Sequence, residues 1–292
     1  MNPIPRKKPK YTILRAIILG VIQGITEFFP ISSSGHLIVV RELIGWEIEE
    51  EIAFDVALHL GTTVAVISFF WKQWVSMIVT ITSWVKHPRG HMDDDRRAQK
   101  NLFLCLCLGS IPIAVVGLVF GNVIIDHVRS PLMVGVMLVV FAAVLFVAER
   151  ISNMSRTMSD IKPWHALSIG LAQVAALVPG VSRSGVTMSV GLTLGFTKED
   201  AAKFSFLLAT PAIVGAGALK AVDLVADGVP SGDIVIIVVG IISSALVGWL
   251  SISFLLRLVQ RQGYLVFILY RLIAGAFVLS YFRVDQYISG LF

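Results

Sequence analysis

Two short polar stretches interrupt an otherwise apolar chain, and the first combines a carboxylate, a hydroxyl and an imidazole. Glu27 lies four residues after Gln23, so both side chains share one face of a helix. Ser33 and His36 are three residues apart and share a face of the helical segment that follows. An ionisable side chain in an apolar segment is costly and usually has a functional partner. We therefore expect the carboxylate, the hydroxyl and the imidazole to converge at one place.

The second stretch supplies the complementary charge. Arg183 and Thr187 are four residues apart on one helical face, and Ser182 and Ser184 flank the arginine. The unpaired N–H groups and the positive dipole end of a helix N-terminus form a cradle for phosphate. A guanidinium group adds a planar, permanently charged fork that matches phosphate oxygens. Each group alone could serve packing or capping, but their occurrence together favours an anion-binding site.

An internal repeat relates the two stretches, because identical residues recur at a constant spacing of 150 positions. The pairs within the stretches are Gly20 and Gly170, Gln23 and Gln173, Ser32 and Ser182, Ser34 and Ser184, and Gly35 and Gly185. The spacing persists at Gly45 and Gly195, Glu49 and Glu199, Phe54 and Phe204, Leu58 and Leu208, and Val64 and Val214. A fixed spacing held over this length indicates an internal duplication.

Both copies predict a helix that breaks in the middle. Pro30 and Pro179 lack the N–H group that would continue a preceding helix, and the Ser/Gly cluster after each proline is typical of a new helix N-terminus. The broken segments cover residues 11–45 and 164–195. Each half of a segment is shorter than the roughly 20 residues that cross a bilayer, so a re-entrant hairpin is expected. Such backbone persists at membrane depth only beside protein or a water-filled cavity.

Composition places the whole chain in a membrane. Of its 292 residues, 56% are hydrophobic and 15% are charged, and the mean hydropathy is +0.82. This is too apolar for an ordinary soluble domain. The net charge of +5 is spread over loops without interleaved aromatic residues, so we expect no nucleic-acid partner.

Six further apolar segments are long enough to cross a membrane, three in each half. They are residues 52–71, 102–120, 132–148, 200–219, 234–256 and 264–281. Each repeat, 11–150 and 163–283, thus has one re-entrant helical hairpin plus three transmembrane helices. A hairpin returns to its own side and three crossings do not, so the second copy must be inverted. We expect an all-α polytopic membrane protein, a single domain over 1–292, with an inverted-topology repeat whose broken helices meet at the site.

The distribution of Lys and Arg predicts the orientation. The links within 86–100 and 150–162 are rich in basic residues, which favours a cytoplasmic location for that side, although the basic N-terminal tail argues against it. The first hairpin enters from the opposite side. The site is therefore expected to open to the extracytoplasmic side.

The chain resembles the bacterial undecaprenyl-pyrophosphate phosphatase, or bacitracin-resistance protein, family. The similarity is carried by Gln-x-x-x-Glu with Phe-x-Pro-Ile-Ser-Ser-Ser-Gly-His at 23–36 and by Pro-Gly-Val-Ser-Arg-Ser-Gly-Val-Thr at 179–187. It extends over nearly the whole chain, including Leu269-Tyr270-Arg271. The resemblance implies an integral enzyme of the bacterial plasma membrane that hydrolyses a polyprenyl pyrophosphate and recycles the lipid carrier for cell-wall synthesis. It implies a divalent cation, Mg²⁺ or Ca²⁺, and leaves open whether the protein is a homodimer.

Carried over by position, the resemblance assigns roles to the residues of both stretches. Glu27, with Gln23 where other members can have Glu, corresponds to the carboxylate motif and is the candidate metal site. The catalytic candidates are Glu27, Ser33, His36 and Arg183, and the substrate-binding candidates are Ser32, Ser34, Ser182, Arg183, Ser184 and Thr187. Ser33, with His36 as base, competes with a metal-bound water as the attacking group.

Two other classes of protein share parts of this pattern. A second lipid-phosphatase family has Pro-Ser-Gly-His and Ser-Arg-x5-His signatures, but Ser189 stands where its last histidine is required. A channel or transporter can also be built from inverted repeats with broken helices. A conduction path needs polar residues along its length, whereas here they gather at the two breaks.

Overall fold

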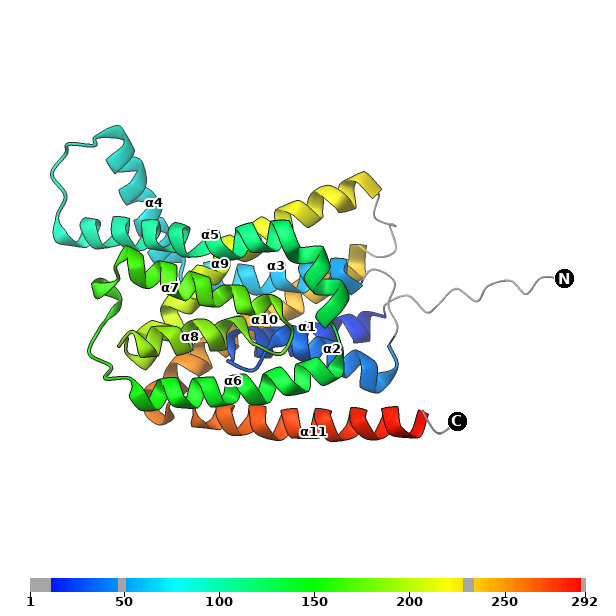
Figure 1. Cartoon of the computed structure of the whole chain (residues 1–292). Helices are drawn as coiled ribbons and strands as arrows, with labels where there is room; N and C mark the ends of the chain where they lie inside the picture. Colours follow the sequence, from blue (N-terminus) through cyan, green and yellow to red (C-terminus); the bar gives the residue numbers. More distant parts are fainter. Residues whose placement is uncertain (1–11, 47–50, 228–233, 290–292) are drawn as a thin grey trace.

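The computed structural model describes residues 12–46, 51–227 and 234–289, and these residues fold into helices joined by short connections (Figure 1). The β-structure recorded among them is an isolated bridge between Arg156 and Phe196. The predicted all-α class is confirmed.

Six helices lie in the described residues of the first half of the chain. They are α1 (Ile13–Phe28), α2 (Ser33–Ile44), α3 (Glu51–Phe69), α4 (Trp71–Lys86), α5 (Asp94–Val128) and α6 (Pro131–Ile151). A polar connection with one 3₁₀ turn, Met158–Asp160, follows α6 as expected. The second half contains α7 (Pro163–Gln173), the 3₁₀ turn Val174–Leu177, α8 (Arg183–Thr193), α9 (Lys198–Asp227), α10 (Ile234–Gln262) and α11 (Leu265–Ser289).

Four helices within the described residues are long and apolar enough to cross a membrane: Asp94–Phe120 of α5, Pro131–Ile151, Ile234–Gln262 and Leu265–Arg283. A fifth candidate is the bent pair of α3 and α4, whose axes differ by 76°. These spans make the protein a polytopic membrane protein. The remaining predicted crossing, residues 200–219, lies within α9, which is not among these candidates, so this crossing stays a prediction.

Some predicted boundaries were wrong. The predicted span 52–71 instead ends at Phe69, and a separate helix, α4, begins at Trp71. The predicted spans 102–120 and 200–219 lie inside the longer helices α5 and α9, because those helices continue beyond their apolar cores.

The two predicted breaks are confirmed, and they share one backbone geometry. Ser32 precedes α2 with φ 75° and Ser182 precedes α8 with φ 73°. Positive φ is uncommon for any residue other than glycine, and it turns the chain sharply before a new helix. Each serine caps its helix: Ser32 Oγ accepts from the Gly35 N–H at 3.3 Å and Ser182 Oγ from the Gly185 N–H at 3.1 Å.

Each hairpin packs through glycine against a long helix of the other half. On α1, a Cβ at Gly24 would lie 2.8 Å from the Gly248 nitrogen of α10. On α7, a Cβ at Gly170 would lie 2.8 Å from the Gly109 carbonyl carbon of α5. Glycine is therefore needed at both crossings for the backbones to approach. In Figure 1, α1 starts near the end of the bundle that holds the C-terminal end of α11, and α7 starts at the opposite end.

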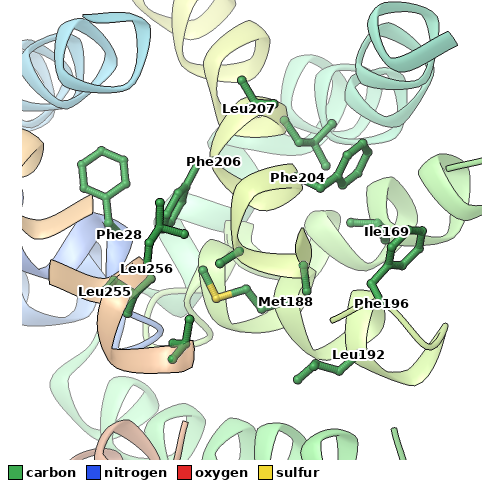
Figure 2. Packing of buried hydrophobic residues seen from close by; sticks show 14 of the residues in the cluster. Phe28, Ile169, Met188, Leu192, Phe196, Phe204, Phe206, Leu207, Leu255 and Leu256 are labelled. Carbon is green, nitrogen blue, oxygen red and sulfur yellow. The ribbon is translucent and has the colours of Figure 1, made fainter. Parts of the chain in front are cut away.

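A hydrophobic cluster holds the first break in place. Phe28, the last residue of α1, is 2% exposed and meets Phe206 of α9 edge to face, with ring centroids 5.3 Å apart. Figure 2 shows this pair beside Leu256 of α10 and Met188 of α8. Glu27, the residue before Phe28, is therefore held in place by a cluster to which α8, α9 and α10 contribute.

Candidate active site

Glu27 lies at the centre of the polar groups that the two breaks bring together. Its side chain is buried, and its Oε2 atom accepts hydrogen bonds from Ser33 Oγ at 2.6 Å and from Gln23 Nε2 at 2.9 Å. Its Oε1 atom accepts from Arg183 Nη2. The predicted convergence of the carboxylate with the hydroxyl is therefore confirmed, and the arginine of the second break joins them.

Arg183 spans two acceptors with its fork. While Nη2 donates to Glu27, Nη1 donates to the Ala209 carbonyl at 3.1 Å. Ala209 belongs to α9, so this bond ties the second break to that helix. A buried carboxylate beside a guanidinium is stabilised as the charged form, so the pair carries one negative and one positive charge.

A pocket of about 220 Å³ opens between the two breaks. Its polar lining residues are Glu27, Ser32, Ser33, Ser34, His59, Ser182 and Arg183, and its apolar ones are Val56, Ile113, Ala176, Ala212 and Ile213. The first N–H groups of an α-helix have no partner within the helix, and the first residues of α2 and α8 lie on this lining. Two positive helix ends thus meet one arginine, which suits a multiply charged anion.

The expectation that His36 joins Glu27 and Ser33 is wrong. His36 Nδ1 lies 2.7 Å from the Ser32 carbonyl oxygen, and Nε2 lies 2.7 Å from the Tyr270 hydroxyl, with the two rings stacked. The carbonyl can only accept, so Nδ1 carries the proton and Nε2 accepts from Tyr270. Although His36 and Ser33 share a helical face, the imidazole turns back toward its own N-cap.

His59 of α3 takes the place expected for His36. Its Nδ1 atom lies 2.9 Å from Gln23 Nε2 and 3.3 Å from Glu27 Oε2, and the residue lines the pocket. Sequence reasoning missed this residue. The signal was present, because His59 is ionisable and lies inside the apolar run 52–71, as Glu27 does within its own segment.

The serines and the threonine predicted to bind substrate divide into two groups. Ser32, Ser34 and Ser182 line the pocket, as expected. Ser184 instead donates to the Phe29 carbonyl at 3.0 Å. Thr187 is buried, donates to the Arg183 carbonyl at 2.7 Å and lies 2.7 Å from Ser205 Oγ. Ser184 and Thr187 lie outside the pocket lining, where they hold the second break in place.

Arg271 of α11, which was noted only as part of the resemblance, ties the two breaks together. It is fully buried and donates from Nη1 to the Pro30 carbonyl at 2.8 Å and from Nη2 to the Gly180 carbonyl at 3.0 Å. It also bonds the carbonyls of Met137, Leu138 and Val181. One guanidinium thus satisfies carbonyls that each break leaves outside a helix.

Two side chains near the pocket carry oxygen atoms of the kind that bind a divalent cation. They are the Glu27 carboxylate and Gln23 Oε1, a buried oxygen without a hydrogen-bond partner. The described residues contain no group of three His, Cys, Asp or Glu side chains placed to hold a metal. Mg²⁺ commonly takes one or two carboxylates and completes its coordination with water and substrate phosphates. Glu27, which lines the pocket, is a carboxylate of this kind.

The chain is similar to known proteins over the region that contains both breaks. The profile of the family described as bacitracin resistance protein BacA matches residues 16–277. The chain belongs to this family. Curated relatives named undecaprenyl-diphosphatase include one from Pelobacter propionicus that is 44% identical to this chain. The aligned region covers 92% of this chain and 96% of that relative. Relatives with the same name from Pelotomaculum thermopropionicum and Alcanivorax borkumensis are 42% and 40% identical, over 92% and 91% of this chain and 96% and 97% of the relatives. Both polar stretches lie within the matched region.

Proposed function

We propose that this protein is an undecaprenyl-diphosphatase, which hydrolyses undecaprenyl pyrophosphate to undecaprenyl phosphate and inorganic phosphate. Membership of the BacA family and the names of the relatives support this assignment. The observation that carries it is Glu27, which hydrogen-bonds Ser33 of one break and Arg183 of the other inside a single pocket. Ser33, the proposed nucleophile, and Arg183, the proposed phosphate-binding side chain, thus both contact Glu27, the proposed proton acceptor.

The residues divide the reaction between the two breaks. Arg183 and the N-termini of α2 and α8 bind the pyrophosphate. Ser33 Oγ attacks the terminal phosphorus while its proton passes to Glu27 Oε2, 2.6 Å away. The bond to the bridging oxygen breaks and the lipid monophosphate leaves. Water then hydrolyses the phosphoserine, and Ser33 recovers its proton.

The contacts favour Glu27 over His36 as the base. Ser33 donates directly to Glu27, whereas the contacts of His36 run to Ser32 and Tyr270. His36 therefore acts as a positioning residue that holds the Ser32 carbonyl and, with it, the turn before Ser33. In the competing route a water attacks, Glu27 takes its proton and Ser33 orients the phosphate.

A divalent cation, when bound by Glu27 and Gln23 with the pyrophosphate oxygens, would neutralise charge that develops on the phosphate. Release of phosphate with and without a chelator tests this requirement. Equal rates under both conditions would remove the cation from the proposal.

We further propose that the two halves, 11–150 and 163–283, form an inverted-topology repeat in the bacterial plasma membrane, with the pocket open to the extracytoplasmic side. The matched turns at Ser32 and Ser182, the opposite starting ends of α1 and α7, and the basic links of 86–100 and 150–162 support this arrangement. In that position the enzyme would recycle the lipid carrier for cell-wall synthesis and confer resistance to bacitracin.

The purified protein in detergent tests the proposed activity against the transporter alternative. We expect it to release phosphate from undecaprenyl pyrophosphate. A protein that moves an anion across vesicles but releases no phosphate in detergent would be a transporter instead.

A further inference from the structure

His59 presents one engaged nitrogen and one accessible nitrogen at the pocket. Nδ1 contacts Gln23 Nε2 at 2.9 Å. No hydrogen bond involves Nε2 within the described part of the chain, nor does Nε2 belong to the buried polar atoms that lack a partner. The side chain is 28% exposed, against 4% for Glu27. The accessible polar atom of His59 is therefore Nε2, on the far side of the ring from Gln23.

The hydrogen-bond network decides which nitrogen carries the proton. Gln23 Nε2 has two hydrogens, and one of them goes to Glu27 Oε2, which can only accept. The second hydrogen points to His59 Nδ1, which must then accept. The neutral imidazole consequently carries its proton on Nε2, so Gln23 fixes the tautomer.

We propose that His59 donates a hydrogen bond from Nε2 to the pyrophosphate of the substrate, which adds a side-chain donor to Arg183 and the two helix N-termini. This inference rests on the proposed function, because it names a substrate contact of the same pocket. His59 is then a catalytic residue that sequence motifs at the two breaks do not include.

The charge balance of the pocket explains why such a donor is needed. The guanidinium of Arg183 faces the Glu27 carboxylate, so the pair has no net charge to offer the substrate. A pyrophosphate must approach that carboxylate, and each uncharged donor on the lining lowers the electrostatic cost. His59 is joined to Glu27 through Gln23, so its donor is held at a fixed position relative to Ser33.

Two substitutions distinguish this role from a structural one. The amide of glutamine reaches the position of Nε2 of histidine, whereas the shorter asparagine reaches that of Nδ1. We expect His59→Gln to keep kcat/KM for undecaprenyl pyrophosphate within about threefold of wild type, and His59→Asn to lower it about tenfold to a hundredfold, the range for one hydrogen bond to a charged acceptor. Full activity of the Asn variant with loss in the Gln variant would make His59 a support for Gln23. Equal activities of the two variants would also overturn the proposal.

Binding of inorganic pyrophosphate, measured by calorimetry, separates this proposal from the proposed function. We expect the Asn variant to bind it about tenfold or more weakly, and the Gln variant to bind it like wild type. These affinities can be compared even if wild type releases no phosphate from the lipid, which would defeat only the proposed function. Equal affinities of wild type and the Asn variant would defeat the role of His59.

His165 of α7 provides a matched control. It is buried, and its Nδ1 accepts from the Lys162 N–H at 3.1 Å while its Nε2 has no partner. The preference should therefore reverse, with His165→Asn more stable to heat than His165→Gln. If His165→Gln were instead the more heat-stable variant, the longer glutamine side chain would be better tolerated at both histidines. The activity of His59→Gln would then no longer support the assignment of a donor at Nε2 of His59.

Discussion

Arg183 connects the two breaks through the geometry of its fork, since Nη2 bonds Glu27 and Nη1 bonds the Ala209 carbonyl. A lysine retains the charge but cannot hold both acceptors and a phosphate at once. We expect Arg183→Lys to lower kcat/KM almost as much as Arg183→Ala. Arg261→Lys, at an exposed arginine of α10, is the control and should leave the rate unchanged. Near-normal activity of Arg183→Lys would reduce Arg183 to a helix cap.

Ser33 competes with water as the attacking group. If Ser33 attacks, Ser33→Ala should remove turnover almost entirely, and rapid quenching of wild type should trap phosphate on Ser33. If it merely orients the phosphate, on the order of a hundredth of the rate should remain. We expect the first outcome. Ser168→Ala, which removes a hydroxyl that bonds the Trp164 carbonyl on an exposed face of α7, is the control. Substantial Ser33→Ala activity without a trapped phosphoenzyme would establish the water route.

At the scale of the elements, the hairpins depend on glycine where they cross the long helices. A Cβ at Gly170 would overlap the backbone of Gly109, 2.8 Å from its carbonyl carbon. We expect Gly170→Ala to separate α7 from α5 and to cost at least about 1–3 kcal/mol of stability, seen as a lower melting temperature in detergent. A Cβ at Gly215 of α9 would meet nothing within 4 Å, so Gly215→Ala should not destabilise the protein. Equal stability of the two variants would contradict the close crossing.

The positions of the breaks could be predicted because the residues that cause them act on the backbone within a few positions. A proline and a serine cap affect the backbone within about one turn, so Pro30 and Ser32 indicate where α1 ends and α2 begins. The α4 helix could not be separated from α3 in this way. Its Trp and Lys residues suit an interface as well as an amphipathic helix, and the 76° bend depends on packing.

At the scale of the whole molecule, the missed residues are those whose partners come from distant helices. His59 meets Gln23 and Glu27 only because α3 packs beside α1. Arg271 bonds five backbone carbonyls, and every residue has a carbonyl, so no complementary charge in the sequence indicates where it binds. His36 was misplaced for a related reason: helical spacing predicts its face but not the rotamer that Tyr270 and Ser32 select.

The proposed orientation of the bundle predicts from which side of the membrane a reagent reaches the pocket. Val56 lines the pocket and is partly buried. In a background without Cys105 and Cys107, we expect Val56→Cys to react with an impermeant thiol reagent outside intact cells. Gly90→Cys, in the exposed basic link after α4, is the control and should react only in opened cells. The reverse pattern would invert the proposed topology.

The central claim is that one pocket, built from both breaks, cleaves the pyrophosphate. The most direct measurement is phosphate release from undecaprenyl pyrophosphate by purified wild type, Glu27→Gln and Arg183→Ala, each checked for an intact fold by its melting temperature. We predict rapid release by wild type and a loss of at least about a hundredfold in each variant, because one change removes the proton acceptor and the other the main cationic donor. Release at the wild-type rate by either folded variant would contradict the account.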